Sequence, residues 1–344
     1  MSDRVQELER LVRHYQERYY NGEPEVSDAE FDAIWDELRR LDPESAVFQE
    51  VGRDESEGFP KREHIIPMGS QDKAADPEAF RKWTRKIAAP SYVVQYKLDG
   101  ASMELQYRNG RFVAGVTRGD GRVGDDISRN VRRMYGVVEE LDTGFTGAVR
   151  GEVMMEHEVH QKHYSDKANC RNAANGVMKR KDGAGSELLR VMVYDAMHAE
   201  EERFFHDEVA KLRWLEDSGF DVVEYRVFED PEEIIAYRQE ISARRGDLPF
   251  DIDGLVVKSP EIDRADMQRA RPEKQIAFKF ALEQAVTQVR SVEWSTTGNS
   301  YTPVAIVAPV RLAGTTVKRA SLVHPEHIDE LGLRLGSEVV ITKR

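Results

Sequence analysis

The stretch Tyr92-Val93-Val94-Gln95-Tyr96-Lys97-Leu98-Asp99-Gly100 decides the fold, because an apolar run leads directly into a lysine, an aspartate and a glycine. Downstream, Met103, Leu105 and Tyr107 alternate with mostly polar residues as far as Asn109-Gly110. Alternation marks a strand, and Asn-Gly is typical of a two-residue hairpin turn. The sequence therefore predicts a β-hairpin just after Lys97, with Lys97 itself at the end of a strand.

More period-two segments follow, separated by helical ones. Strands are predicted around 112–116, 149–155, 252–259 and 275–282, and helices around 205–215 and 232–243. Strands mixed with helices indicate an α+β domain over residues 63–283.

The segments on either side have other patterns. Apolar residues recur at helical spacing in residues 3–20, and Ser27 with Glu30 forms a capping box for a second helix. Two helices bury little surface alone, so residues 1–62 are expected to dock on something else. Residues 284–344 are predicted to be almost all β, with strands at 285–294, 302–310, 315–323 and 338–342 and a helix at 325–331. This pattern is typical of an OB-type barrel that lacks one of its five strands.

Composition limits the classes of protein. A chain of 344 residues accommodates two or three domains, and no apolar run reaches the length of a membrane span. The N-terminal residues lack a signal peptide's apolar segment, so a cytoplasmic protein is expected. One cysteine excludes an internal disulfide and a Cys₄ or Cys₂His₂ zinc site. The net charge of −13 argues against general nucleic-acid affinity, and charge alone favours a solvated loop for the basic run 171–181.

Three lysines are the candidate reactive groups. A lysine is protonated near neutral pH unless it is desolvated or placed beside other cations. Strand alternation puts Lys279 on the face opposite Ile276, Phe278 and Phe280, and Lys258 opposite its apolar neighbours. We expect Lys97, Lys258 and Lys279 to converge, to bind a phosphate and to keep Lys97 deprotonated. The alternative for each lysine alone is a solvated strand residue.

Two further motifs complete an ordered set, Thr117-Arg118-Gly119-Asp120-Gly121 and Arg150-Gly151-Glu152. On these residues the chain resembles the bacterial NAD⁺-dependent DNA ligases, inside the wider covalent nucleotidyltransferase group, and the resemblance extends to Arg344. It implies an ATP-grasp-like nucleotidyltransferase fold with antiparallel sheets. The implied domains are a helical module that binds nicotinamide mononucleotide (NMN) at 1–62, an adenylation domain at 63–283 and an incomplete OB fold at 284–344.

The resemblance also implies the chemistry. Lys97 would attack the α-phosphate of NAD⁺ and release NMN; AMP would pass to the 5′-phosphate of a nick, which the 3′-hydroxyl then seals. Arg118 and Glu152 would hold the AMP ribose, and Lys258 and Lys279 would neutralise the α-phosphate. Asp253 would hold Mg²⁺ through water. Ser70, Gln71 and Gln95 would line the adenine pocket, where they depart from the family pattern, although a glutamine oxygen still accepts the adenine amino group.

Four residues of the N-terminal helices and three basic residues complete the expected site. Tyr19, Tyr20, Asp28 and Asp32 match the NMN module, since carboxylates and aromatic faces suit a cationic nicotinamide. The alternative is an ordinary core around Phe31 and Trp35 with surface acids. Residues 169–176 resemble a family loop. The basic residues expected to meet DNA are Arg171, Lys179 and Arg245, and the alternative for each is a surface residue.

Family members continue through a complete OB barrel, a four-cysteine zinc finger and further domains. We therefore expect a truncated ligase or the adenylation subunit of a split one, acting on nicked double-stranded DNA. The expected cofactors are NAD⁺ and Mg²⁺ without zinc, and a split enzyme would need a second subunit. A monomer without a membrane partner is expected. The alternatives are an RNA ligase or capping-type nucleotidyltransferase and a non-catalytic nick-binding protein.

Overall fold

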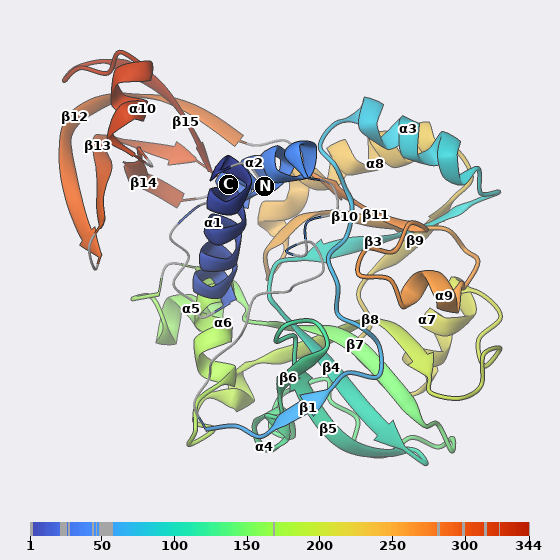
Figure 1. Cartoon of the computed structure of the whole chain (residues 1–344). Coiled ribbons are helices and arrows are strands. Elements are labelled where there is room, and N and C mark those ends of the chain that lie inside the picture. Colours follow the sequence, from blue (N-terminus) through green and yellow to red (C-terminus); the bar gives the residue numbers. More distant parts are fainter. Residues whose placement is uncertain are drawn as a thin grey trace. The chain divides into compact units, whose positions relative to one another are not determined.

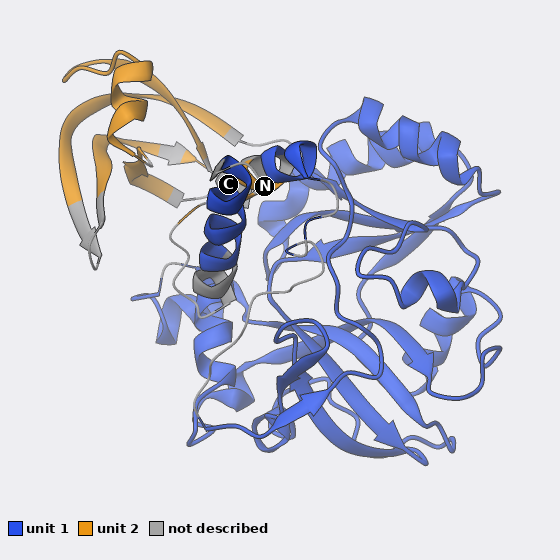
Figure 2. Ribbon diagram, viewed as in Figure 1, with its two compact units in different colours: residues 1–25, 37–280 blue, residues 26–36, 281–344 orange. Residues whose placement is uncertain are grey.

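The computed structural model describes residues 3–20, 26, 28–42, 45, 47, 58–167, 169–280, 283–297, 300–312, 315–322 and 324–343 (Figure 1). The chain divides into two compact units (Figure 2). The larger unit holds residues 1–25 and 37–280, and the smaller holds 26–36 and 281–344. Each unit has its own apolar core.

The two predicted N-terminal helices are present. Helix α1 is Asp3–Tyr20 and α2 is Asp28–Leu41. Within the larger unit, Leu8, Val12 and Leu38 are fully buried, and Arg4 donates to Glu37 at 2.8 Å. Neither these nor any other described helix is long and apolar enough to cross a membrane.

Two sheets form the core of the larger unit. One has the order β2-β11-β10-β3-β9, antiparallel except for the β11–β2 pair. Its strands are Lys73–Ala74, Gln275–Lys279, Ile252–Lys258, Tyr92–Leu98 and Tyr225–Phe228. Helices α3 (Pro77–Ile87) and α8 (Pro231–Arg244) contact each other and elements of this sheet.

The second sheet is wholly antiparallel, in the order β5-β4-β7-β8. Its strands are Arg111–Thr117, Ala101–Arg108, Gly147–Met154 and Arg190–His198. Around it lie α4 (Ser128–Val131), α5 (His157–His163), α6 (Cys170–Met178) and α7 (Glu208–Asp217). Short elements complete the unit: β1 (Lys61–Glu63) paired with β6 (Val123–Asp125), and α9 (Arg264–Met267).

The Lys97 stretch joins the two sheets. Strand β3 ends at Leu98 and β4 begins at Ala101, so Asp99-Gly100 carries the chain from one sheet into the other. A Cβ on Gly100 would lie 2.4 Å from the Val153 carbonyl oxygen, so the crossing requires glycine. The predicted hairpin is confirmed: β4 pairs with β5, and Asn109 and Gly110 have φ of 50° and 78°.

The secondary structure predicted for residues 169–176 is wrong. Residues 170–178 form helix α6 and not a loop. The Asn169 side chain accepts from the Asn172 amide as an N-cap, and Ala173, Ala174 and Val177 are buried on one helical face. The N-cap and the helical spacing are both present in the sequence and indicate a helix.

The smaller unit contains an antiparallel sheet in the order β14-β13-β12-β15. The strands are Thr315–Ser321, Ser300–Leu312, Glu283–Thr297 and Glu338–Lys343, and α10 is Pro325–Glu330. Val289, Val307, Leu312 and Ile341 lie in its core. The four predicted strands and the helix are therefore confirmed here.

Candidate active site

Lys97 and Lys279 stand on either side of strand β10, and Gly254 lies between them in register with both. Glycine is required here, because a Cβ on Gly254 would lie 2.6 Å from the Phe278 carbonyl oxygen on β11. The register of β10 shifts between Ile252 and Gly254, at Asp253. Lys97 Nζ lies 2.8 Å from Asp253 Oδ1, and Lys279 Nζ lies 3.4 Å from Oδ2. One carboxylate is thus held between two lysines.

The charge state of Lys97 differs from the sequence expectation. Burial lowers the pKa of Lys97, but Asp253, and then Asp99 and Glu152, raise it by more, so the pKa is raised overall. The expectation that neighbouring cations keep Lys97 deprotonated is therefore wrong. A carboxylate, and not a lysine, is the charge nearest to its amine.

Lys258 lies away from this row. It is paired in register with Val93, because β10 runs antiparallel to β3 and carries Lys258 to its other end. The side chain is buried, donates to the Tyr194 carbonyl at 3.2 Å and pairs with Glu208 at 3.3 Å. The expected convergence of three lysines is therefore corrected to a pair, Lys97 and Lys279, with Lys258 further along the strand.

Gln95 shares its main contact with Lys258. Its Nε2 donates to the same Tyr194 carbonyl at 3.2 Å. Gln95 is only 1% exposed, and its Oε1 has no hydrogen-bond partner among the described residues. A buried acceptor without a donor is unfavourable by about 1–3 kcal/mol. The amide oxygen therefore suits a ligand that brings an N–H donor.

The second sheet supplies a carboxylic acid to the site. Glu152 on β7 is paired in register with Ser102 on β4, and the Ser102 hydroxyl donates to it at 3.0 Å. Burial raises the pKa of Glu152 to about 7, although Lys97 and the Ser102 hydrogen bond act in the opposite direction. Glu152 therefore changes charge near neutral pH.

Arg118 and Ser70 are also brought together. The Arg118 guanidinium donates to the Met68 carbonyl at 3.0 Å and to Ser70 Oγ at 3.3 Å. Glu104 fixes the start of this segment, because its buried carboxylate accepts from the amides of Ile65 and Ile66 at 2.9 and 3.0 Å. Gln71 is partly buried next to Ser70.

A buried network of charges under Lys258 was missed from the sequence. Lys211 is fully buried and pairs with Glu208 at 2.6 Å and with Asp195, which also pairs with Arg150. Arg150 in turn donates to the Pro67 carbonyl at 3.1 Å. The network therefore connects Lys258 to the segment that carries Ser70. One sign of this network is present in the sequence: Lys211 lies on the same face of α7 as Leu212 and Leu215.

The remaining predicted residues fall in different places. Arg171 donates to Asp99 at 2.9 Å and so belongs to the Lys97 loop. Lys179 lies 4.0 Å from Asp125, and Arg245 lies over the Phe280 ring at 5.5 Å. The side chains of four residues lie outside the described part: Tyr19, Tyr20, Asp28 and Asp32.

Comparison with known proteins gives a consistent picture. The sequence model described as "NAD-dependent DNA ligase adenylation domain" matches residues 56–283. Models of the NAD-dependent DNA ligase OB-fold domain and of a DNA ligase-like N-terminal NAD⁺-binding domain match residues 286–344 and 1–49.

Curated DNA ligases match nearly the whole chain. That of Treponema denticola is 51% identical over 356 residues, which cover 99% of this chain and 55% of the relative. That of Treponema pallidum is 49% identical, and the match covers 99% of this chain and 43% of the relative. The DNA ligase of Sorangium cellulosum is 35% identical, with 99% and 55% covered. The chain thus spans about half the length of the curated relatives it matches.

Proposed function

The chain belongs to the NAD-dependent DNA ligase family, and from that premise we propose that it carries the adenylating activity of such an enzyme. Lys97 Nζ attacks the α-phosphorus of NAD⁺; an N–P bond forms, and the bond to NMN breaks. AMP then passes to the 5′-phosphate of nicked double-stranded DNA, and the 3′-hydroxyl displaces AMP. The observation that carries this proposal is the pair of lysines across Gly254.

The row of Lys97 and Lys279 suits the transferring phosphate. An α-phosphate above Gly254 lies within reach of both amines, so that Lys97 attacks while the Lys279 ammonium offsets the developing charge. Gly254 allows the close approach of β11, the strand that carries Lys279.

The other end of β10 suits the adenine. Gln95 Oε1 accepts from the adenine amino group. We assign Lys258 to the base and not to the α-phosphate, because Lys258 and Gln95 donate to the same Tyr194 carbonyl. Glu152 and Arg118 are assigned to the ribose. Ser70 and Gln71, on the segment that Arg118 holds, complete the adenine side.

The proton on Lys97 must leave before the attack. Asp253 is its nearest acceptor, but the same carboxylate raises the pKa of Lys97 and opposes deprotonation. The carboxylate of Asp253 fits water-mediated Mg²⁺, which prefers oxygen ligands. A bound Mg²⁺ would supply positive charge that offsets Asp253 and the α-phosphate.

Further assignments rest on family membership. NMN is assigned to Tyr19, Tyr20, Asp28 and Asp32. Nicked DNA is assigned to Arg171, Lys179 and Arg245, of which Arg171 reaches the Lys97 loop directly. The same proposal includes an ATP-grasp-like arrangement of the two sheets. It also includes a monomeric state, action in the cytoplasm and a second subunit.

The test is the intact mass of the chain after incubation with Mg²⁺ and either NAD⁺ or ATP. We expect one added AMP with NAD⁺ and none with ATP. Lys97→Ala is expected to abolish the adduct, whereas Lys82→Ala, at an exposed lysine of α3, keeps it. An adduct with ATP alone would favour the RNA-ligase alternative, and no adduct with either would favour a nick-binding protein.

A further inference from the structure

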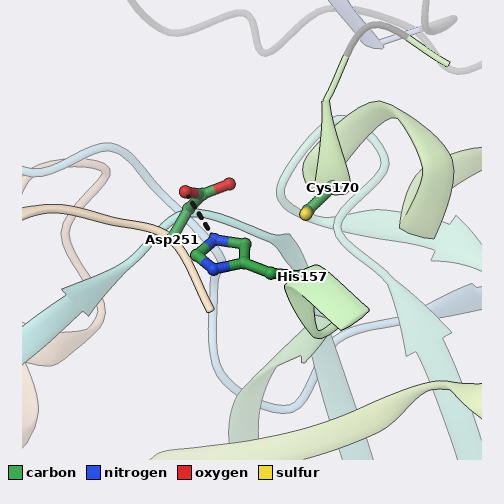
Figure 3. Close-up of side chains that lie close together, drawn as sticks. All are labelled: His157, Cys170 and Asp251. Atoms are coloured by element: carbon green, nitrogen blue, oxygen red, sulfur yellow. Dashed lines mark hydrogen bonds and ion pairs between the residues drawn. The ribbon is translucent and has the colours of Figure 1, made fainter. Parts of the chain in front are cut away.

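Three side chains that this reaction does not use lie together beside the Lys97 loop. His157 begins α5, Cys170 begins α6, and Asp251 directly precedes β10. Figure 3 shows the His157 ring turned toward the Asp251 carboxylate, with the Cys170 sulfur nearby. One ligand atom from each residue lies within 4.8 Å of the others, and His157 Nε2 is 3.0 Å from Asp251 Oδ1.

We propose that His157, Cys170 and Asp251 bind one divalent transition-metal ion of the Zn²⁺ class. Imidazole nitrogen, thiolate sulfur and carboxylate oxygen are the ligands that Zn²⁺ takes in proteins. Magnesium and calcium prefer oxygen ligands alone, so the donor set selects against them.

The separations require only small movements to hold such an ion. Bonds of about 2.0–2.1 Å at the tetrahedral angle put a nitrogen and an oxygen ligand about 3.3 Å apart, and a sulfur ligand about 3.6 Å from either. The nitrogen–oxygen distance of 3.0 Å is near that value. The sulfur, which lies within 4.8 Å of both atoms, needs to move closer by at most about 1.2 Å. Three protein ligands leave the fourth position to water.

The backbone at His157 and Asp251 is fixed by hydrogen bonds. The His157 amide donates to the Pro249 carbonyl at 2.8 Å, and the Asp99 amide donates to the Asp251 carbonyl at 3.0 Å. The side chains of His157 and Asp251 are 41% and 44% exposed, which leaves a path for an ion, while Cys170 is buried. A bound ion would therefore join α5, α6 and the segment before β10, next to Asp99.

The sequence expectation of no zinc rested on the count of cysteines. That count excludes sites with two or more thiolates. A mixed site needs one cysteine, and its ligands come from segments whose proximity only the fold establishes. The inference is independent of the adenylation chemistry.

Titration of the metal-free full chain with Co²⁺ tests the proposal. Because the chain has one cysteine, a thiolate-to-cobalt charge-transfer band can arise only from Cys170. We expect the band to saturate at one equivalent of Co²⁺ and to disappear when Zn²⁺ is added. Binding converts the thiol to a thiolate and requires a neutral imidazole, so at least one proton leaves for each ion, measurable by calorimetry in buffers of different ionisation enthalpy.

Variants identify the ligands. Cys170→Ser is expected to abolish the band, and His157→Gln and Asp251→Asn, which keep the thiol, to weaken Co²⁺ binding at least about tenfold each. His163→Gln, at an exposed histidine of the same helix, serves as the matched control and is expected to bind normally. Circular dichroism checks that each variant is folded. The absence of a band in excess Co²⁺, or unchanged affinity in both His157→Gln and Asp251→Asn, would overturn the proposal.

Discussion

At the scale of single residues, the burial of Glu152 connects stability to pH. Burial raises the pKa of Glu152 from 4.5 to about 7, so the folded chain holds this proton more tightly than the unfolded chain does. The associated stability is fully present below the unfolded pKa and is lost as pH rises through about 7. The difference between the two pKa values corresponds to about 3 kcal/mol.

Glu152→Gln removes this titration. The variant is expected to gain up to about 3 kcal/mol in unfolding free energy relative to the parent between pH 4.5 and pH 8. Urea denaturation of both proteins at several pH values measures the difference, in which the other titrating groups cancel. A difference that stays constant with pH would contradict the assignment.

Gln95→Met separates stability from substrate binding. Methionine keeps the length of glutamine but removes the buried oxygen that has no donor among the described residues. Lys258 still satisfies the Tyr194 carbonyl, so the unfolding free energy is expected not to fall by more than about 1 kcal/mol. The KM for NAD⁺ in the adenylation assay is expected to rise about tenfold or more, because the adenine amino group loses its acceptor. An unchanged KM would remove Gln95 from the adenine pocket.

The motifs predicted which side chains come together better than they predicted the charges around those side chains. Two of the three lysines expected to converge, Lys97 and Lys279, lie beside one carboxylate, that of Asp253, whereas Lys258 does not. The sign of the pKa change on Lys97 was not predictable from the motifs. It depends on the Asp253 carboxylate, 2.8 Å from Lys97 Nζ. Asp253 lies where the register of β10 shifts.

At the scale of elements, strongly periodic segments were predictable. An apolar run predicts β3, and alternation predicts the hairpin of β4 and β5; the strands of the smaller unit were predicted as well. Helix α6 was missed although it carries its own N-cap. Strand order could not be read from alternation, and order is what places Lys279 and Lys97 across one glycine.

The position of Gly254 between Lys97 and Lys279 predicts the effect of adding one methyl group there. A Cβ on Gly254 would lie 2.6 Å from the Phe278 carbonyl oxygen and 2.7 Å from Lys279 Cα, both of them backbone atoms. Gly254→Ala is expected to lower the unfolding free energy by about 1–3 kcal/mol. The adenylation rate is expected to fall about 100-fold, because a displacement of about 1 Å at reacting groups has that effect.

The matched control is Gly144→Ala, since a Cβ there meets nothing within 4 Å among the described atoms. Its unfolding free energy is expected to stay within about 0.5 kcal/mol of the parent. Chemical denaturation and single-turnover adenylation measure both effects. Equal unfolding free energies and equal adenylation rates in the two variants would mean that β11 shifts to accommodate the methyl group without moving the lysines.

At the scale of the whole molecule, charge and composition carried little information about the site. A net charge of −13 argues against a nucleic-acid partner, yet the family to which the chain belongs acts on DNA. The net charge of the whole chain does not describe the electrostatic field at one site. Arg171, for example, donates to Asp99 of the Lys97 loop.

The two compact units predict how adenylation changes thermal unfolding. All residues assigned to AMP lie in the larger unit, from Ser70 to Lys279, whereas residues 26–36 and 281–344 contribute none. AMP attached to Lys97 stabilises only the state in which its contacts exist. Calorimetry of the adenylated chain, freed of NMN, is therefore expected to show two transitions.

Only one of those transitions should move. The larger unit's Tm is expected to rise by about 2–4 °C for each kcal/mol of stabilisation, and the smaller unit's Tm to stay in place. Lys97→Ala treated in the same way should show no movement, because it accepts no AMP. A shared shift of both transitions would mean that the two units unfold as one cooperative body, and the AMP contacts would then stabilise residues that they do not touch.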